Sequence, residues 1–533
     1  MTEAYDYIVV GAGSAGCLMA NRLSANPNSK VLLLEAGGRD NWIWLHVPVG
    51  YLYAIGDKRS DWRFRTAPEP GLGGRDIAYP RGRVIGGSSA INGMIYMRGQ
   101  ARDYDGWRQL GLDGWGWDDV LPYFLKHEDH WAGAKPLHGA GGEWRVERPR
   151  IAWDILDAVR DAAAEVGIPK ISDFNQGDNE GSDYFEVNQR RGLRVSAARA
   201  FLKPALKRPN LRLVTGAHAR RILFEGRRAT GVEYEAQGRV VAASAREIVL
   251  TAGAIGTPHL LEISGVGWPE RLTKIGVPVV HALPGVGENL QDHLQLRTIF
   301  RIEGAKTLNV EFRSLWKRGL MGANYAINRR GPLTMAPSQL GLFARSSSDY
   351  ATANLEFHVQ PLSLPKFGDP LHDFPAITLS VCNLRPASRG FVHATSRDPL
   401  AAPLIQPNYL SEEEDRRVAV DSIRLARSIA AAPGLARYRP VEYLPGAEKL
   451  SETELVAAAG EIGTTIFHPV GTCRMGRRED ASAVVDGRLR VHGMEGLRIA
   501  DASVMPRITS GNTNSPTLMI AEKGAAMALE EAR

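Results

Sequence analysis

The chain has 533 residues, of which 44% are hydrophobic, 8% aromatic and 23% charged. This composition excludes wholesale disorder, and the length predicts about two or three domains whose cores need neither disulfides nor a structural metal. The 65 basic and 59 acidic residues leave a net charge of +6 without a long run of like charges. We therefore expect no nucleic acid among the partners.

The three cysteines, Cys17, Cys382 and Cys473, are too few for a secreted disulfide framework and show no metal-ligand spacing. We expect a reducing compartment and no bound metal. The first residues lack a basic and apolar leader, and no apolar stretch reaches the length of about 18 residues that a spanning helix needs. These features predict a soluble, cytoplasmic protein and leave peripheral contact with the inner membrane open.

A strand, a glycine turn, a helix and a second strand are predicted at the start of the chain. Residues 5–10 are a short β-branched and aromatic run, typical of a buried parallel strand, and residues 11–16 follow as Gly-Ala-Gly-Ser-Ala-Gly. Residues 17–25 have the apolar spacing of a helix. Residues 31–34 are typical of a second buried strand, which ends at Glu35. This order predicts a βαβ unit.

The spacing of Gly11, Gly13 and Gly16 is that of a dinucleotide-binding turn. In such a turn the first glycine permits the tight bend, the second lets the backbone approach a pyrophosphate, and the third lets helix and strand pack closely. The helix N-terminus offers free N–H groups to the anion, and Glu35 can accept hydrogen bonds from a ribose. The alternative is a plain glycine turn in an unrelated α/β protein.

A second glycine-rich segment, residues 80–93, presents consecutive backbone N–H groups with little side-chain bulk. Such a segment can wrap a second phosphate or the edge of a flat ring. Taken by itself, it is equally typical of a flexible surface loop.

The rest of the chain mixes strands and helices, after an irregular segment at residues 41–80 that we expect to be loop and cover. A small meander is predicted from short strands at residues 211–214, 221–223 and 231–234. Further strands are predicted at residues 247–250, 355–359, 377–381 and 497–500. Helices are predicted at residues 153–166, 416–431, 452–459 and 517–530.

Six further motifs occur in the order of a known family. They lie at residues 82–92 (continuing to Tyr96, Gly99 and Asp105), 253–267, 285–293, 468–476, 501–506 and 511–517. Together with the first glycine turn, they resemble the glucose–methanol–choline (GMC) oxidoreductase family of FAD enzymes over nearly the whole chain. The resemblance is to bacterial choline-dehydrogenase-like and aliphatic alcohol dehydrogenases rather than to fungal sugar oxidases.

This resemblance implies an α/β protein in which a Rossmann-like FAD-binding domain is interleaved with an α+β substrate domain, built on an antiparallel sheet with helices. The implied FAD-binding segments are residues 1–150, with their cover loops, 205–298 and 461–533, the last of which carries the catalytic pair. The implied substrate-domain segments are residues 151–204 and 299–460.

The resemblance also implies which residues hold FAD. They are Gly11, Gly13, Ser14, Ala15, Gly16, Glu35, Ala36, Arg81, Gly86, Gly87, Ser88, Asn92, Gly93, Ala219, Ala252, Asp501, Ala502, Asn514, Pro516 and Thr517. In some members of the family, a histidine directly before the asparagine of the glycine-rich loop binds FAD covalently. That position is Ile91 here, and because an aliphatic side chain cannot form this bond we expect non-covalent FAD.

Two residues, His468 and Asn512, match the family's catalytic positions. A neutral histidine suits the removal of a hydroxyl proton because its pKa lies near the working pH. An asparagine amide can donate a hydrogen bond to the substrate oxygen and stabilise the developing alkoxide. Outside this motif context, the alternatives are a buried structural histidine and a turn asparagine.

Substrate contacts are expected from an alternating strand that places His358, Glu356 and Gln360 on one face. A similarly placed histidine lines the substrate pocket of choline-oxidising relatives, and the alternative for His358 is an ordinary buried strand histidine. Glu356 is also a candidate carboxylate for a choline cation, although we can assign no aromatic cage. We expect His293 to hold its turn rather than to react.

The apolar, proline-broken residues 361–367 favour a loop at the substrate entrance and therefore an uncharged aliphatic or aromatic alcohol. The alternative is an ordinary surface loop.

The resemblance implies FAD-dependent oxidation of a primary alcohol to an aldehyde, with proton abstraction by His468 and hydride transfer to flavin N5. The main prediction is a dehydrogenase that passes electrons to a quinone or a dye, and the alternative is an oxidase that uses O₂. A more distant alternative is a light-driven decarboxylase, a lyase whose members resemble this chain around Cys382 and Arg385 but lack the catalytic histidine. A non-enzymatic binding module would leave His468 and Asn512 without a role.

Overall fold

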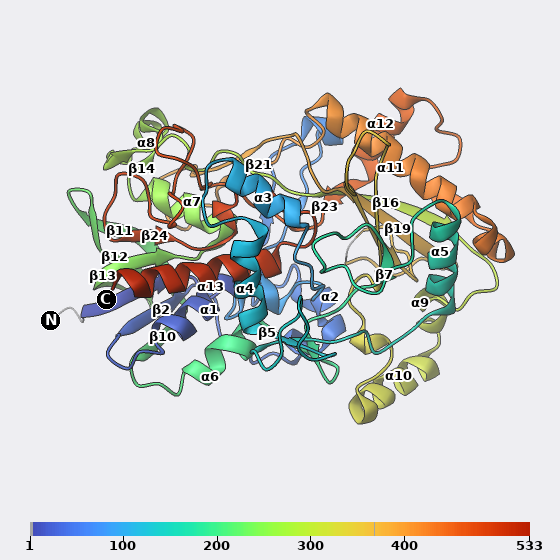
Figure 1. The fold of residues 1–533 in the computed structure, drawn as a ribbon, viewed down its shortest axis with the longest axis horizontal. Helices are drawn as coiled ribbons and strands as arrows, with labels where there is room; N and C mark the ends of the chain where they lie inside the picture. The colour runs from blue at the N-terminus through green and yellow to red at the C-terminus, as the bar shows by residue number, and fades with distance from the viewer. Residues whose placement is uncertain (1–3, 367, 533) are drawn as a thin grey trace.

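Two seven-stranded sheets organise the chain, which the computed structural model describes over residues 4–366 and 368–532. Figure 1 shows helix α13 (Asn514–Glu531) lying across the first sheet in one half of the molecule. In the other half, helices α11 (Glu413–Ala431) and α12 (Glu452–Ile462) follow the outer side of the second sheet. The predicted α/β class, with a second antiparallel sheet, is confirmed.

The first sheet has the strand order β10-β2-β1-β13-β12-β11, and β24 pairs with β13. Neighbouring strands from β10 to β13 and on to β24 are parallel, whereas β13, β12 and β11 form an antiparallel meander. The strands are β1 (Ala4–Val10), β2 (Val31–Glu35), β10 (Leu211–Thr215), β11 (Ala217–Glu225), β12 (Arg228–Ala236), β13 (Arg239–Leu250) and β24 (Leu497–Ile499). The predicted βαβ unit is confirmed, since helix α1 (Ser14–Leu23) joins β1 to β2.

One strand of this sheet lies in a different place from the prediction. Residues 211–214 do not belong to the meander, because β10 extends the parallel edge with Leu211 opposite Val31 of β2. Gly216, the single residue between β10 and β11, has a φ of 64° and turns the chain out of the parallel edge. The predicted strand at residues 247–250 is the end of the longer β13, whose first half supplies the third strand of the meander.

The second sheet has the order β22-β16-β19-β18-β17-β7, with antiparallel pairs throughout, and β23 pairs with β16. Its strands are β7 (Gly181–Tyr184), β16 (Leu294–Arg301), β17 (Leu340–Ala344), β18 (Leu355–Gln360), β19 (Ala376–Asn383), β22 (Val441–Leu444) and β23 (Gly463–Thr465). Alternate residues of β16, β18 and β19, such as Leu296, Phe357 and Val381, are buried in one apolar core with helices α5 (Asp154–Glu165) and α11. The division into five domain segments stays a prediction, and β16 runs across its boundary at residue 298.

Shorter elements complete the described chain. The other α-helices are α2 (Tyr51–Ala54), α3 (Ala101–Gln109), α4 (Trp117–His127), α6 (Lys203–Ala205), α7 (Gly253–Ile263), α8 (Pro269–Lys274), α9 (Leu308–Glu311) and α10 (Leu315–Asn328). Two-stranded pairs are formed by β3 (Phe64–Arg65) with β4 (Ala78–Tyr79), β5 (Glu128–His130) with β6 (Trp144–Val146), β8 (Gln189–Arg190) with β9 (Leu193–Arg194), β14 (Val266–Gly267) with β15 (His281–Ala282), and β20 (Phe391–His393) with β21 (Leu404–Gln406). Across the described residues, no helix combines the length and the apolar character that crossing a bilayer requires.

Candidate active site

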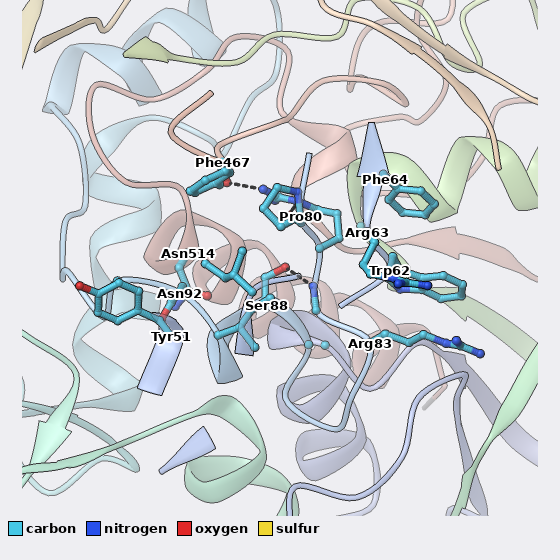
Figure 2. A pocket seen from close by; sticks show the side chains of 18 of the residues that line it. Tyr51, Trp62, Arg63, Phe64, Pro80, Arg83, Ser88, Asn92, Phe467 and Asn514 are labelled. Atoms are coloured by element: carbon cyan, nitrogen blue, oxygen red, sulfur yellow. Dashed lines mark hydrogen bonds between the residues drawn. The ribbon is translucent and has the colours of Figure 1, made fainter. Parts of the chain in front are cut away.

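A cavity of about 1300 Å³ is lined by residues of both sheets. The carboxyl ends of β1, β2 and β13 line one part of it, and side chains of β16 and β18 line another. Figure 2 shows Ser88, Asn92 and Asn514 close together in its wall, with Tyr51 to one side and Trp62 to the other. In open α/β sheets ligands bind at the carboxyl ends of the parallel strands, so the first part of the cavity is the expected nucleotide site.

The glycines of the first turn have two different roles. A Cβ at Gly16 would lie 1.8 Å from the Gly11 carbonyl oxygen, so Gly16 is required by the packing of the protein itself. A Cβ at Gly13 would meet only Gly87 Cα and the Thr251 carbonyl oxygen, both at 3.9 Å, and Gly13 lines the cavity. The space beside Gly13 is therefore available to a ligand, as a pyrophosphate site requires.

Glu35 closes the nucleotide part of the cavity at the end of β2. Its carboxylate accepts hydrogen bonds from the Ala12 and Gly37 backbone N–H groups at 2.9 and 2.7 Å. Burial raises the pKa of Glu35 to about 7, although these two donors and the charge of Arg83 oppose the rise. Further donors, such as the hydroxyls of a ribose, would stabilise the ionised carboxylate.

Polar atoms near the start of α13 lack partners among the described residues. Asn514 accepts a hydrogen bond from the Ser14 hydroxyl at 2.7 Å through Oδ1, but its buried Nδ2 has no hydrogen-bond partner. Asn512 Oδ1 is likewise buried and unpaired. Unpaired buried polar groups are costly, so these atoms fit a polar ligand between the glycine turn and α13.

Most of the residues predicted to hold FAD line the cavity. They are Gly11, Gly13, Ser14, Ala15, Glu35, Ala36, Arg81, Gly87, Ser88, Asn92, Gly93, Ala219, Ala252, Asp501, Ala502, Asn514 and Thr517. Gly16, Gly86 and Pro516 lie outside the lining. Gly86 has a φ of 91° and donates its N–H to the Ala12 carbonyl oxygen at 2.7 Å, which joins the two glycine-rich segments. Pro516 lies in the first turn of α13, where a proline costs no hydrogen bond.

His468, His293 and Asn512 form a chain of side-chain contacts at the cavity wall. His293 Nε2 lies 3.2 Å from the Leu384 carbonyl oxygen, and because a carbonyl oxygen only accepts, this nitrogen carries the hydrogen. A neutral His293 then has an unprotonated Nδ1, which lies 3.0 Å from His468 Nδ1, so His468 donates through Nδ1. His468 Nε2 keeps its lone pair and lies 3.0 Å from Asn512 Nδ2.

Burial keeps both imidazoles neutral. The pKa of His468 is lowered well below its usual value by burial first, and then by the neighbouring His293, His358 and Arg81. Burial also lowers the pKa of His293. A neutral His468 whose Nε2 carries no hydrogen is the form in which a histidine accepts a proton.

A buried carboxylate, Asp292, holds the backbone of both histidines. Its Oδ1 accepts the backbone N–H groups of His293 and His468 at 2.9 and 2.8 Å. Its Oδ2 accepts three hydroxyl groups, those of Tyr79, Tyr409 and Thr465. Five hydrogen bonds to one buried carboxylate fix the position of the histidine pair.

The residue before His468 has an unusual backbone. Phe467 has a φ of 72°, a left-handed conformation that is costly for an aromatic residue. The Arg81 guanidinium donates to the Phe467 carbonyl oxygen at 2.8 Å (Figure 2), and the Thr465 hydroxyl accepts the Phe467 N–H at 2.8 Å. These bonds hold the turn that presents His468 to the cavity.

The cavity face of the second sheet is polar. Gln295 and Arg297 of β16 and His358 and Gln360 of β18 line it, and Arg297 and His358 flank Ser380 of β19. Burial lowers the pKa of Arg297 to about 10, so its guanidinium is still charged at pH 7. A cation at this wall disfavours a cationic ligand beside it.

Apolar side chains complete the substrate part of the cavity. Residues 361–366 form no helix or strand, which confirms the predicted loop, and Leu362 and Leu364 line the cavity. Phe367, the last residue of that prediction, lies outside the described residues. Apolar lining also comes from Leu308, Phe312, Met321, Leu333 and Met335.

Glu356 lies behind the lining rather than in it. Its Oε1 is 3.2 Å from His358 Nε2, and both residues are buried. Cys382 lies opposite Glu356 on β19, and the possible metal-ligating atoms of this trio lie within 4.8 Å of one another. Spacing along the chain predicts no such group, because its members come from two strands. Glu356 is therefore placed as a buried neighbour of His358.

Sequence reasoning missed Gln295 and Arg297 and took His293 for a turn residue. The available signal was the alternation of residues 293–297, which places every second side chain of β16 on the same face as His293.

The fold and the cavity together define a protein of the dinucleotide-binding α/β class, with the buried His468 in the wall of the cavity. Two family models, both described as GMC oxidoreductase, match residues 5–295 and 386–521. The alcohol dehydrogenase (acceptor) of Pseudomonas putida is 42% identical over 98% of this chain and 95% of its own length. The mitochondrial choline dehydrogenase of Mus musculus is 39% identical over 98% and 89%. The chain belongs to the GMC oxidoreductase family.

Solved structures agree with this assignment. Pyridoxine 4-oxidase from Mesorbium loti has a TM-score of 0.89 at 32% identity, with 98% of each chain covered. A formate oxidase has a TM-score of 0.92 at 26% identity, with 99% of each chain covered. The protein is therefore an FAD-binding enzyme, and the ligand space beside Gly13 and the unpaired amide nitrogen of Asn514 fit that cofactor.

Proposed function

We propose that this enzyme oxidises an uncharged primary alcohol to an aldehyde, with His468 as the catalytic base, and passes the electrons to a quinone or dye. The observation that supports the base most directly is the hydrogen-bond order Leu384–His293–His468, which leaves His468 Nε2 unprotonated. Asn512 Nδ2 and His468 Nε2 lie 3.0 Å apart, so one substrate oxygen can contact both.

In this mechanism the alcohol oxygen displaces the hydrogen bond between Asn512 and His468 and lies within hydrogen-bond distance of both side chains. His468 Nε2 accepts the hydroxyl proton, and Asn512 Nδ2 donates to the oxygen and stabilises the negative charge that develops on it. His293 holds the ring of His468 in the required tautomer throughout. Bound FAD supplies the acceptor for the hydride.

An uncharged alcohol is supported by the lining of the cavity. Arg297 places a cation on the same wall as His358, on the other side of Ser380, and no carboxylate on β16 or β18 reaches the lining, since Glu356 lies behind it. Leu362 and Leu364 add apolar surface. A trimethylammonium substrate would need the opposite charge at this wall.

The light-driven decarboxylase alternative finds little support here. Cys382 and Arg385 are not among the described residues that line the cavity, and Arg385 donates to Gln100 and Thr352 instead. His468, which such lyases lack, lies in the wall.

The proposal is tested by anaerobic mixing of the purified protein with a panel of alcohols that includes choline. We expect an uncharged primary alcohol to bleach the flavin. A quinone dye should then reoxidise the flavin quickly, and O₂ should reoxidise it slowly. Fast reoxidation by O₂ would show an oxidase, and bleaching by choline alone would overturn the proposed substrate.

The attachment of FAD is tested separately. Because Ile91 occupies the position of the linking histidine, acid precipitation should release all of the yellow colour into the supernatant. Colour that stays in the protein pellet would contradict non-covalent binding.

A further inference from the structure

Helix α10 has two apolar faces, one of which is uncovered. Its inner side contributes Arg318, Met321 and Gly322 to the cavity lining, and Tyr325 is buried, with its hydroxyl bonded to the Gly192 carbonyl oxygen at 3.0 Å. On the opposite side Trp316, Leu320, Ala323 and Ile327 follow one another at intervals of four, three and four residues. This spacing places them in a single stripe along the helix.

The stripe is exposed to an extent that is unusual for such large side chains. Trp316 is 76% exposed, Leu320 52% and Ile327 80%, and Leu315 at the start of the helix is 79% exposed. Figure 1 shows α10 at the lower edge of the molecule, beside α9 and away from both sheets. Contiguous apolar surface of this kind marks an interaction site.

The charge around the stripe is strongly positive. Between residues 305 and 330 the chain has one acidic side chain, Glu311, which pairs with Lys317 at 2.8 Å. The basic residues of this segment are Lys306, Arg313, Lys317, Arg318, Arg329 and Arg330. An exposed aromatic and aliphatic stripe on a helix, in a segment rich in basic side chains, is typical of helices that lie in the surface of an anionic membrane.

We propose that α9 and α10 bind the surface of an anionic phospholipid membrane, with Trp316, Leu320 and Ile327 inserted at the level of the headgroups. A second copy of this chain fits the stripe less well, because a symmetric contact would bring the two basic segments together. The lipid surface supplies the opposite charge.

Binding in this orientation connects the membrane to the cavity. Leu308 and Phe312 of the α9 segment line the cavity together with the inner face of α10. An apolar alcohol or a membrane quinone would therefore reach the cavity from the lipid side of α10. This delivery step rests on the proposed alcohol oxidation, whereas the binding itself does not.

Vesicle sedimentation of the FAD-loaded protein tests the proposal without turnover. We expect the protein to sediment with vesicles of phosphatidylglycerol and phosphatidylcholine, less with phosphatidylcholine alone, and less at high salt. The combined variant Trp316→Ser, Leu320→Ser, Ile327→Ser should lower the partition coefficient about tenfold or more. Arg313→Glu with Arg330→Glu should weaken binding to the anionic vesicles.

The matched control is Leu450→Ser, since Leu450 is 71% exposed and lies just before α12. It should bind vesicles like the wild type. Equal vesicle binding by the triple variant, or no binding by the wild type at low salt, would overturn the proposal. So would a wild-type dimer that becomes monomeric in the triple variant, because the stripe would then be a self-interface.

Two readouts separate this inference from the proposed function. The variant residues do not line the cavity, so oxidation of a short, water-soluble alcohol without vesicles should be unchanged in the triple variant. If neither the wild type nor the variants oxidised that alcohol, the result would count against the proposed function. The vesicle result would not be affected.

Discussion

The two parts of the cavity are built from different kinds of atoms. The nucleotide part uses mainly backbone, namely glycines that leave space and N–H groups near the start of α1, together with carboxylates such as Glu35 and Asp501. The substrate part uses side chains on alternate positions of β16 and β18, such as Arg297 and His358. We therefore expect a substitution in the first part to remove the cofactor and a substitution in the second part to change which alcohol is preferred.

Gly13→Val should have the largest effect. Because a Cβ at Gly13 meets only ordinary contacts with the protein, the added bulk falls in the space that FAD needs. We expect colourless protein of lower thermal stability without alcohol-dependent dye reduction, measured by flavin released on denaturation. Gly106→Val is the control, since a Cβ at Gly106 meets nothing within 4 Å. Normal flavin content in Gly13→Val would contradict the assignment.

His468→Ala should keep its FAD and reduce it about 10²–10⁴-fold more slowly under anaerobic conditions. In the wild type the rate should rise with pH through the pKa of His468, since the protonated ring cannot accept a proton. This rise in rate should occur at a pH below the usual pKa range of histidine, and it should be absent in His468→Ala. Asn512→Ala should slow the same step by roughly 10²–10³, and the two losses should not multiply. If His468→Ala reduced its flavin at the wild-type rate, another residue would have to be the base.

His293→Leu should slow flavin reduction by about 10², because His468 Nδ1–H loses the acceptor that fixes its tautomer. The expected signature is a changed pH profile with normal FAD content. His293→Gln, whose side-chain oxygen can accept the same hydrogen, should recover part of the rate. If the leucine and glutamine variants lost the same share of the flavin-reduction rate, the role of His293 would be packing rather than control of the His468 tautomer.

Arg297→Gln should have the smallest effect. Removing this cation should raise kcat/KM for choline about tenfold and change the value for a neutral alcohol much less. Steady-state kinetics with both substrates measure the ratio, and the exposed Arg478→Gln serves as the charge-matched control. An unchanged ratio would place the substrate away from β16.

The sequence predicts the nucleotide part well because its signals are local. All four signals, Gly11, Gly13, Gly16 and Glu35, lie within one βαβ unit. In the structure Gly11, Gly13 and Glu35 line the cavity, and Gly16 packs against the backbone of Gly11. The substrate part depends on contacts between distant segments: His293 meets His468 across 175 positions. Nothing near His293 in the chain indicates that contact.

Helix α10 escaped prediction for a different reason. Its apolar residues lie on both the inner and the outer face, so no single stripe stands out, and Gly319 and Gly322 lower its helix propensity. Its exposed stripe becomes recognisable only when the structure shows which face is covered.

The contact between the first and last helices has a consequence for how this enzyme is made. Helix α1 packs against α13, and the Ser14 hydroxyl reaches Asn514 across 500 positions. A ribosome makes residues 512–517 about 500 residues after the glycine turn. The two sides of the cofactor site therefore cannot meet until that later segment has been synthesised, so FAD has to be available after this point.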